Sequence, residues 1–132
     1  MSILRFRVGK LIRDKLPQIM RDQGLAVFDR RLDDADFVAA LKDKLVEEAR
    51  EAQAATDARE LTDELADLSE VMLALAAVQG LTLADIEDRR LAKRAERGGF
   101  DDRVYNAAVE AETGLPAADY YLARPSQYPR ED

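Results

Sequence analysis

The residues in this chain best suited to chemistry are carboxylates that recur at helical spacing in two neighbouring groups. With about 100° per residue, each group falls within an arc of about 100° on its own helix. Like charges three and four residues apart destabilise an isolated helix by roughly 0.2–0.5 kcal/mol per pair. Because hard divalent cations prefer oxygen ligands, the pattern predicts Mg²⁺, with Mn²⁺ as the alternative, between the two helices. The two groups are Glu47, Glu48 and Glu51, followed by Glu60, Asp63, Glu64 and Asp67.

The excess negative charge of the chain is confined to this acidic stretch. The net charge is −7, and residues 45–70 hold nine acidic residues against two basic ones. Solvated helix faces are the main alternative explanation, but they usually alternate acids with Lys or Arg four residues away. Here only Arg50 and Arg59 interrupt the acids. No basic stripe dominates elsewhere, so we expect no nucleic-acid partner.

The composition narrows the chemistry further. The chain has no Cys, His or Trp, which excludes zinc fingers, thiol nucleophiles, imidazole bases and Ser-His-Asp triads. The absence of cysteine fits a reducing cytoplasm, which is the expected location. The amino-terminal residues have no apolar run typical of a signal peptide. The longest apolar run, Val71–Val78, is much shorter than the roughly 20 residues of a membrane span, so no membrane partner is expected.

Two long helices are expected to position the carboxylates. The first is predicted over Ala35–Ala55, capped by Asp33 or Asp34, and the second over Asp57–Gln79. The second half of the second helix, Val71–Val78, is apolar all round and must therefore be buried on every side. A chain of 132 residues offers few helices to surround it, so a homodimer or higher homo-oligomer is predicted.

Shorter elements flank this pair. Pro17 favours the first turn of a short helix, and Thr82 with Asp85 forms a capping pattern for a third long helix. Gly114-Leu115-Pro116 is interpreted as a break, followed by an extended tail rich in Tyr and Pro. The expected elements are a helix over 17–23, a strand or extended connector over 25–32, a helix that ends at residue 97 and a further short helix over 104–111.

The acidic residues also resemble a family signature. Glu47-Glu48-Ala49-Arg50-Glu51 followed by Glu64-Leu65-Ala66-Asp67 is similar to the EExxE…ExxD signature of the all-α nucleoside triphosphate pyrophosphohydrolases. That superfamily includes MazG-like enzymes, dimeric dUTPases and phosphoribosyl-ATP pyrophosphohydrolase. Two further pieces, Lys10–Pro17 and Lys93–Phe100, resemble the predicted house-cleaning branch, which acts on noncanonical nucleotides. The resemblance covers about residues 8–103.

The resemblance implies a fold, a domain organisation and an activity. The fold would be all-α, a small antiparallel helix bundle of the MazG-like type completed by dimerisation. Residues 1–103 would form the catalytic domain, and residues 104–132 an extension packed on the body or on a partner subunit. The activity would be Mg²⁺-dependent cleavage of a nucleoside triphosphate between the α- and β-phosphates, giving a nucleoside monophosphate and pyrophosphate. A bound metal lowers the pKa of water, which suits a chain without histidine.

The resemblance also implies a role for individual residues. The metal ligands would be Glu48, Glu51, Glu64 and Asp67. Glu47 would be an additional ligand or would orient the attacking water, so that Glu47 and Glu48 form the predicted catalytic pair. The phosphates would be held by Lys10, Arg13, Lys15, Lys93 and Arg97, with close backbone approach at Gly98. The alternative for each cation, taken singly, is an exposed surface position.

Two other functions remain open at this point. One is hydrolysis of phosphoribosyl-ATP in histidine biosynthesis, which the amino-terminal segment and the Arg97–Phe100 ending fit less well. The other is a regulatory or assembly module that keeps the fold without catalysis. The complete acidic motif argues against the second, and Mn²⁺ titration separates it from an enzyme, because a module without catalysis does not need the metal.

Overall fold

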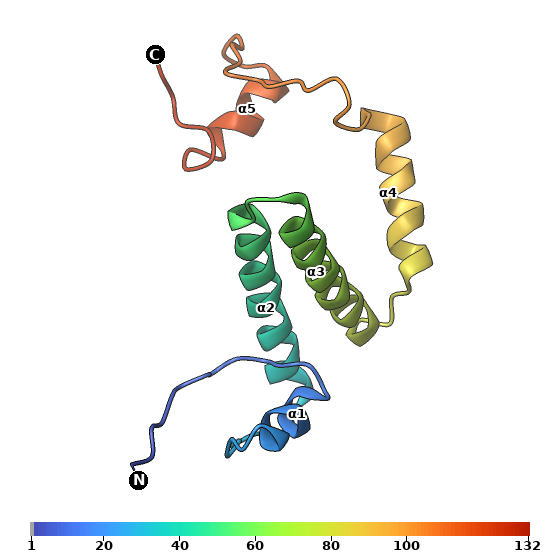
Figure 1. Cartoon of the computed structure of the whole chain (residues 1–132). Helices are drawn as coiled ribbons and strands as arrows, with labels where there is room; N and C mark the ends of the chain where they lie inside the picture. The colour runs from blue at the N-terminus through green and yellow to red at the C-terminus, as the bar shows by residue number, and fades with distance from the viewer. Residues whose placement is uncertain (1) are drawn as a thin grey trace. The chain divides into compact units, whose positions relative to one another are not determined.

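The computed structural model describes residues 2–132, and all regular secondary structure within them is helical. The all-α prediction is therefore confirmed. Residues 25–32 were expected to form a strand or an extended connector, and they form the connector. The helices are α1 (Leu16–Asp22), α2 (Asp34–Ala54), α3 (Ala58–Val78), α4 (Leu83–Arg97) and α5 (Pro116–Leu122), labelled in Figure 1.

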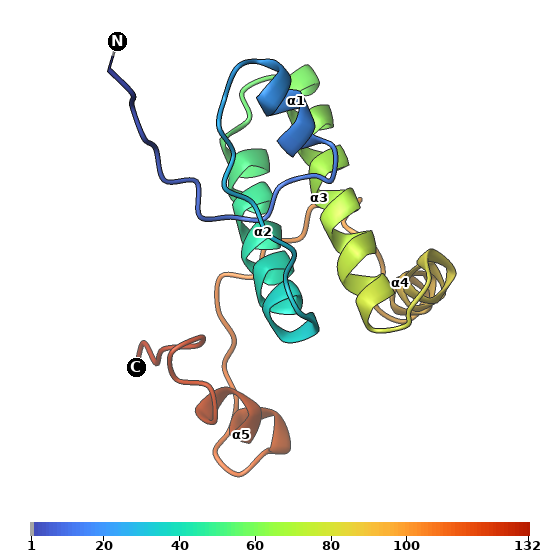
Figure 2. The same cartoon turned by 90° about the horizontal axis from the view of Figure 1, so that it is seen from below.

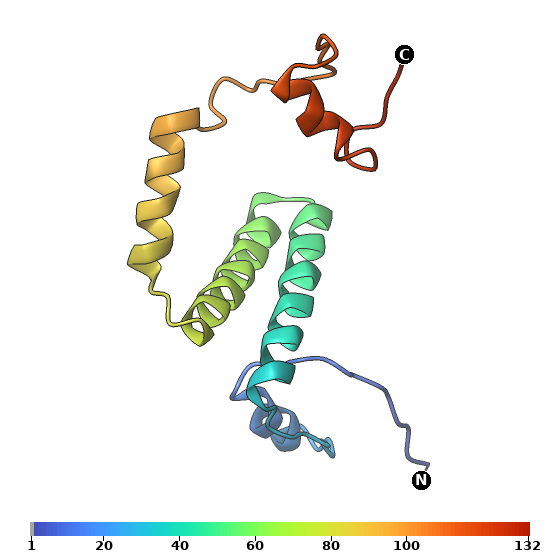
Figure 3. The same ribbon diagram turned by 180° about the vertical axis from the view of Figure 1, so that it is seen from behind.

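The centre of the fold is an antiparallel pair formed by α2 and α3, which lie side by side (Figures 1 and 3). Both helices begin where the sequence places a capping aspartate. The side chain of Asp33 accepts a hydrogen bond from the Asp36 amide, and that of Asp57 accepts one from the Glu60 amide, each at 2.8 Å. Such a cap contributes about 1 kcal/mol.

The turn between the two helices is closed by Glu60, a member of the second acidic group. Its carboxylate accepts hydrogen bonds from the amide of Thr56 at 3.0 Å and from the hydroxyl of Thr56 at 3.1 Å. Glu60 therefore has a structural partner within the turn. Because the turn is short, α3 must run back along α2, and the acidic faces of the two helices are brought together.

The core between α2 and α3 is small. Leu41, Val71 and Ala76 are buried, with 2%, 8% and 7% of their surface exposed. In the apolar segment Val71–Val78, Met72 keeps 37% of its surface exposed. The single chain therefore does not bury this segment on every side. The predicted oligomer, which would cover it, stays a prediction.

The residues before α2 are tied to one another by a short network. Arg21 at the end of α1 donates to the carbonyl of Val27 at 3.0 Å and also pairs with the carboxylate of Asp29. The segment before α1 passes beside α2, as seen from below in Figure 2, and two of its cations reach acids on α2 and α3. This arrangement brings the amino-terminal motif to the acidic faces.

The capping pattern predicted before α4 is confirmed. The Asp85 carboxylate accepts from the Thr82 amide at 2.8 Å, and the Thr82 hydroxyl accepts from the Asp85 amide at 3.2 Å. The helix ends at Arg97, and the next residue, Gly98, has a φ of +84°. Glycine takes this left-handed conformation without strain, which explains why the helix stops there.

By contacts the chain divides into one unit that ends at Ala95 and a second unit, Glu96–Asp132. In the second unit α5 carries Tyr120 and Tyr121, whose rings pack edge-to-face at 5.2 Å. Tyr128 packs against Tyr121 with ring centroids 4.9 Å apart, so these tyrosines contact one another within the unit. The boundary expected at residue 103 stays a prediction.

Two expectations for the carboxyl-terminal region were wrong. Residues 104–111 form no helix, and Val104 and Tyr105 are 86% and 91% exposed, so nothing packs against an amphipathic face there. A short helix without such packing is unstable in water. The tail predicted to be extended after Gly114-Leu115-Pro116 begins instead with α5, which contains Tyr120 and Tyr121. Pro116 suits the start of this helix, because it lacks an amide N–H that the first helical turn does not need.

No single helix among residues 2–132 is long and apolar enough to cross a membrane, although α3 and α4, bent by 108°, pass the same length and composition test as a pair.

Candidate metal centre

Three of the predicted metal ligands converge between α2 and α3. Glu48 and Glu51 on α2 and Glu64 on α3 each offer a carboxylate oxygen, and these atoms all lie within 4.8 Å of one another. Glu48 and Glu51 are three residues apart, so they share one face of α2. The antiparallel path of α3 places Glu64 opposite them. We refer to these three residues as the acidic cluster.

The acidic cluster is partly removed from solvent. Glu48 is buried, with 5% of its surface exposed, and Glu64 is half-buried. The Oε2 atoms of Glu48 and Glu64 are inaccessible to water and receive no hydrogen bond from any donor in residues 2–132. A buried carboxylate oxygen without a donor is energetically costly. These two oxygens therefore have no positively charged partner among the described residues, although Glu48 Oε1 lies 3.5 Å from Lys44 Nζ.

The pKa values of two cluster members, Glu48 and Glu64, are raised. Proton sharing with the neighbouring Glu51 carboxyl, followed by burial and the charges of Glu51, Glu48 and Asp67, raises the pKa of Glu64 to about 7. Burial is the largest cause that raises the pKa of Glu48, followed by Glu51 and Asp67, whereas Lys44 opposes the shift. Carboxylates this close cannot all ionise at neutral pH unless a cation compensates their charge.

The fourth predicted ligand, Asp67, lies beside the cluster but has a partner of its own. Arg13 donates from Nη2 to Asp67 Oδ1 at 2.7 Å. The charge of Asp67 still contributes to the raised pKa of Glu48 and of Glu64, so its carboxylate is close to both. Arg13, which was predicted to bind phosphate, is thus held at the edge of the acidic cluster.

Glu47 lies between two ammonium groups. Lys10 Nζ is 2.6 Å from Glu47 Oε1, and Lys44 Nζ is 3.2 Å from Glu47 Oε2. These contacts, the Lys10 hydrogen bond first, hold the pKa of Glu47 below its ordinary value. Both carboxylate oxygens are therefore engaged by cations. In the acidic cluster, by contrast, Oε2 of Glu48 and Oε2 of Glu64 receive no hydrogen bond from the described residues.

Lys44 was not among the residues singled out from the sequence. Its Nζ also lies 3.5 Å from Glu48 Oε1, so that it contacts both members of the predicted catalytic pair. The signal was present in the spacing, because Lys44 precedes Glu47 by three residues and Glu48 by four. Residues so spaced face each other on a helix.

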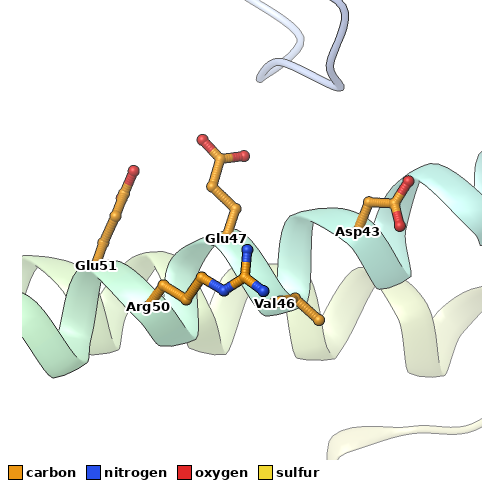
Figure 4. Close-up of a pocket in the computed structure, with 5 residues that line it drawn as sticks. All are labelled: Asp43, Val46, Glu47, Arg50 and Glu51. Carbon is orange, nitrogen blue, oxygen red and sulfur yellow. The ribbon is translucent and has the colours of Figure 1, made fainter.

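The surface of α2 next to the cluster is hollowed. In Figure 4 the side chains of Glu47 and Glu51 project from the same side of α2, and the guanidinium of Arg50 lies beside them. This hollow is open to solvent, so a ligand larger than an ion has access to the rim of the site. Its lining residues are Asp43, Val46, Glu47, Arg50 and Glu51.

The remaining predicted phosphate-binding residues are Lys15, Lys93, Arg97 and Gly98. Lys15 caps α1 and Lys93 lies on α4; both are exposed, and neither forms an ion pair with any described residue. Arg97 and Gly98 belong to the second unit, where the Arg97 Nε atom is 4.0 Å from Glu96. Within the first unit, Lys10 and Arg13 are the predicted cations that contact the acidic groups.

A divalent cation fits the donors that the structure assembles. All three members of the cluster offer carboxylate oxygen, which hard ions such as Mg²⁺ and Mn²⁺ prefer. The two unpartnered Oε2 atoms, on Glu48 and Glu64, are the ligand atoms that such an ion would satisfy. No histidine or cysteine is present to favour zinc.

Two antiparallel helices with an acidic cluster between them match the class predicted from the signature, an all-α hydrolase that uses a divalent metal. A comparison with protein-family models agrees. The model of the phosphoribosyl-ATP pyrophosphohydrolase family matches residues 16–94, more than half of the chain. The chain belongs to this family and therefore to the MazG-like all-α nucleoside triphosphate pyrophosphohydrolase superfamily. It is a nucleotide pyrophosphohydrolase by class.

The chain matches no curated protein and no solved structure at a significant level of similarity. The region matched by the family model includes the whole acidic cluster and Lys93. It begins after Lys10 and Arg13, the two cations that contact Glu47 and Asp67.

Proposed function

We propose that the protein hydrolyses nucleoside triphosphates, noncanonical ones included, between the α- and β-phosphates, with Mg²⁺ as its cofactor and Mn²⁺ as a substitute. The observation that carries this proposal is the convergence of Glu48, Glu51 and Glu64 within 4.8 Å, two of them with buried, unpartnered oxygens. Asp67 is the proposed fourth ligand because its charge acts on the same groups. The family match supports the reaction class.

The proposed ligands hold the ion, which when bound supplies charge compensation for the phosphates and lowers the pKa of water. The protein's own residues would limit access of water and position the reacting groups. Burial of Glu48 excludes bulk water from one side of the site. Glu47, whose carboxylate stays ionised between Lys10 and Lys44, is placed to orient the attacking water or to add a ligand. Phosphoryl-type displacement depends mainly on such positioning and on charge stabilisation.

Lys10 and Arg13 are the proposed phosphate-binding cations. Each lies at the rim of the acidic cluster, and their side chains keep 49% and 57% of their surface exposed. Guanidinium groups match phosphate oxygens in pairs, whereas an ammonium acts as a point charge. An anionic triphosphate that enters here would compete with Glu47 and Asp67 for these donors. Lys15, Lys93, Arg97 and Gly98 remain predicted contacts.

Phosphoribosyl-ATP is the second candidate substrate, favoured by the name of the family whose model matches residues 16–94. The same acidic cluster would serve either substrate, because both present a phosphate chain to the ion. A homodimer in the cytoplasm is also proposed. The incompletely buried Val71–Val78 segment supports the dimer, and the absence of cysteine fits the location.

The test is pyrophosphate release from a panel of canonical and noncanonical nucleoside triphosphates and phosphoribosyl-ATP, with Mg²⁺. Wild-type protein should hydrolyse at least one of them, whereas Glu48→Gln and Asp67→Asn should be inactive. Glu70→Gln on the exposed side of α3 is the matched control and should keep its activity. If wild type, Glu48→Gln and Asp67→Asn are equally inactive on every substrate, the proposal is rejected. The substrate with the highest kcat/KM decides between the two candidates.

A further inference from the structure

Lys44 is a half-buried cation between the acidic residues of α2, and the function proposed above gives it no role toward the metal ligands. Its side chain is 17% exposed, and its Nζ lies 3.2 Å from Glu47 and 3.5 Å from Glu48. Long, flexible lysine side chains on a helix normally extend into water. Here the side chain is instead held between two acids of the same helix.

The contacts around Lys44 form an alternating row of charges. Lys10 Nζ contacts Glu47 Oε1, Glu47 Oε2 contacts Lys44 Nζ, and Lys44 Nζ contacts Glu48 Oε1. The last acid in this row, Glu48, therefore has one oxygen paired with Lys44. Its other oxygen, Oε2, is buried and receives no hydrogen bond from the described residues. The two oxygens of Glu48 therefore have different surroundings.

We propose that Lys44 is a positioning residue for the metal centre. It holds Glu48 through Oε1, so that Oε2 is kept available to the ion, and it also contacts Oε2 of the neighbouring Glu47. This inference rests on the metal-dependent function proposed above. Groups that orient metal ligands in this way typically change metal affinity or activity by about 10–100-fold when they are removed.

Two physical effects of removing Lys44 have opposite signs, which makes the proposal testable. If Lys44 acted only through its charge, its removal would make the site more negative and would tighten binding of a divalent cation. If Lys44 orients Glu48, its removal lets the carboxylate rotate, and binding weakens. The direction of the change therefore separates positioning from simple charge compensation.

The experiment is calorimetric titration of the full-length, metal-free protein with Mn²⁺ alone, without nucleotide. Lys44→Met should weaken binding by about 10-fold or more, and Lys44→Arg, which keeps a cation in place, should restore it to within about threefold of wild type. Lys42→Met is the matched control, because Lys42 is exposed on the same helix and forms no ion pair with any described residue. It should bind as wild type does.

Lys44→Met binding that equals or exceeds wild type would overturn the proposal, as would equal losses in Lys44→Met and Lys42→Met. Thermal melting of the metal-free variants distinguishes positioning from folding. If Lys44 acts by positioning, Lys44→Met and Lys44→Arg should have similar melting temperatures. A melting temperature of Lys44→Met low enough to account for the loss of affinity would contradict the positioning role. If wild-type protein itself binds no Mn²⁺, the proposed function fails, and that outcome is separate from a failure at Lys44.

Discussion

The first half of α3 is acidic and the second half is apolar, and the chain neither pairs all the acids nor buries all the apolar surface. The first half carries Glu64 and Asp67, whose charges are met in part by Arg13, while Glu64 Oε2 stays buried without a donor. The second half, Val71–Val78, has an apolar surface that the chain covers at Val71 and Ala76 but leaves partly open at Met72.

The acidic half therefore lacks a hydrogen-bond donor among the described residues for one buried oxygen, and the apolar half keeps part of its surface exposed. In the proposed function a small divalent ion supplies positive charge to the acidic half. A partner subunit is proposed to cover the apolar half. The following predictions test the two halves of the helix separately.

The largest expected effect is on catalysis by the acidic half. Glu64→Gln should lower kcat/KM for pyrophosphate release by at least about 100-fold, because it removes a charged ligand from the ion. The same variant should raise the melting temperature of the metal-free protein, since it removes repulsion within the cluster. Glu70→Gln, a neighbour on the exposed side of α3, should change neither quantity. Retained activity in Glu64→Gln would show that the acidic cluster is not the metal centre.

The next effect is stabilisation by the metal. At a free Mg²⁺ concentration 100 times the dissociation constant, binding should stabilise the folded protein by about 2.7 kcal/mol. The melting temperature in Mg²⁺ should exceed that in a chelator by several degrees for wild type and for Met72→Lys, but not for Glu64→Gln. An equal increase in Glu64→Gln would place the bound ion outside the acidic half.

A smaller effect is expected from the apolar half. Met72→Lys adds a charge to the surface proposed to meet a partner, and it should weaken self-association by about 10-fold or more, or about 1.4 kcal/mol. Sedimentation over a range of protein concentrations measures this change. Gln53→Lys, an exposed position on α2, is the control and should associate as wild type does. If wild-type protein is monomeric throughout, the predicted partner surface is wrong.

The smallest effect concerns pH in the absence of metal. The pKa of Glu64 is raised from 4.5 to about 7, mainly by proton sharing with Glu51. Between these values the folded chain keeps a proton that the unfolded chain has released, so stability should fall as the pH rises through this range. The raised pKa of Glu48 acts in the same direction. In metal-free protein the melting temperature should therefore be lower at about pH 8 than at about pH 5.

Glu64→Gln provides the control for this pH dependence. Glutamine does not titrate, so the decrease in melting temperature should become smaller. Carboxylates with lowered pKa values, such as Asp29 and Glu87, add stability above their ordinary pKa and therefore do not produce a decrease in this range. A decrease of unchanged size in Glu64→Gln would assign the effect to other groups.

The sequence alone was sufficient for features that depend on neighbours along the chain. A cap at Asp33 or Asp34 and the reciprocal pair of Thr82 and Asp85 were expected from residues within three positions of each helix start. The structure shows the cap at Asp33 and confirms the Thr82–Asp85 pair. The shared face of Glu48 and Glu51 follows from helical period in the same way. The failed helix over 104–111 shows the limit, because its local pattern found no surface to pack against.

Only the tertiary structure decided which charges meet. Lys10 and Glu47 are 37 residues apart, and Arg13 and Asp67 are 54 apart, so no helical period relates them. The convergence of Glu64 with Glu48 and Glu51 depends on the register of α3 against α2, which the Thr56–Glu60 turn and the packing of the helix pair set together. Local periodicity determines the face on which a side chain lies, whereas its partner depends on how separate helices pack.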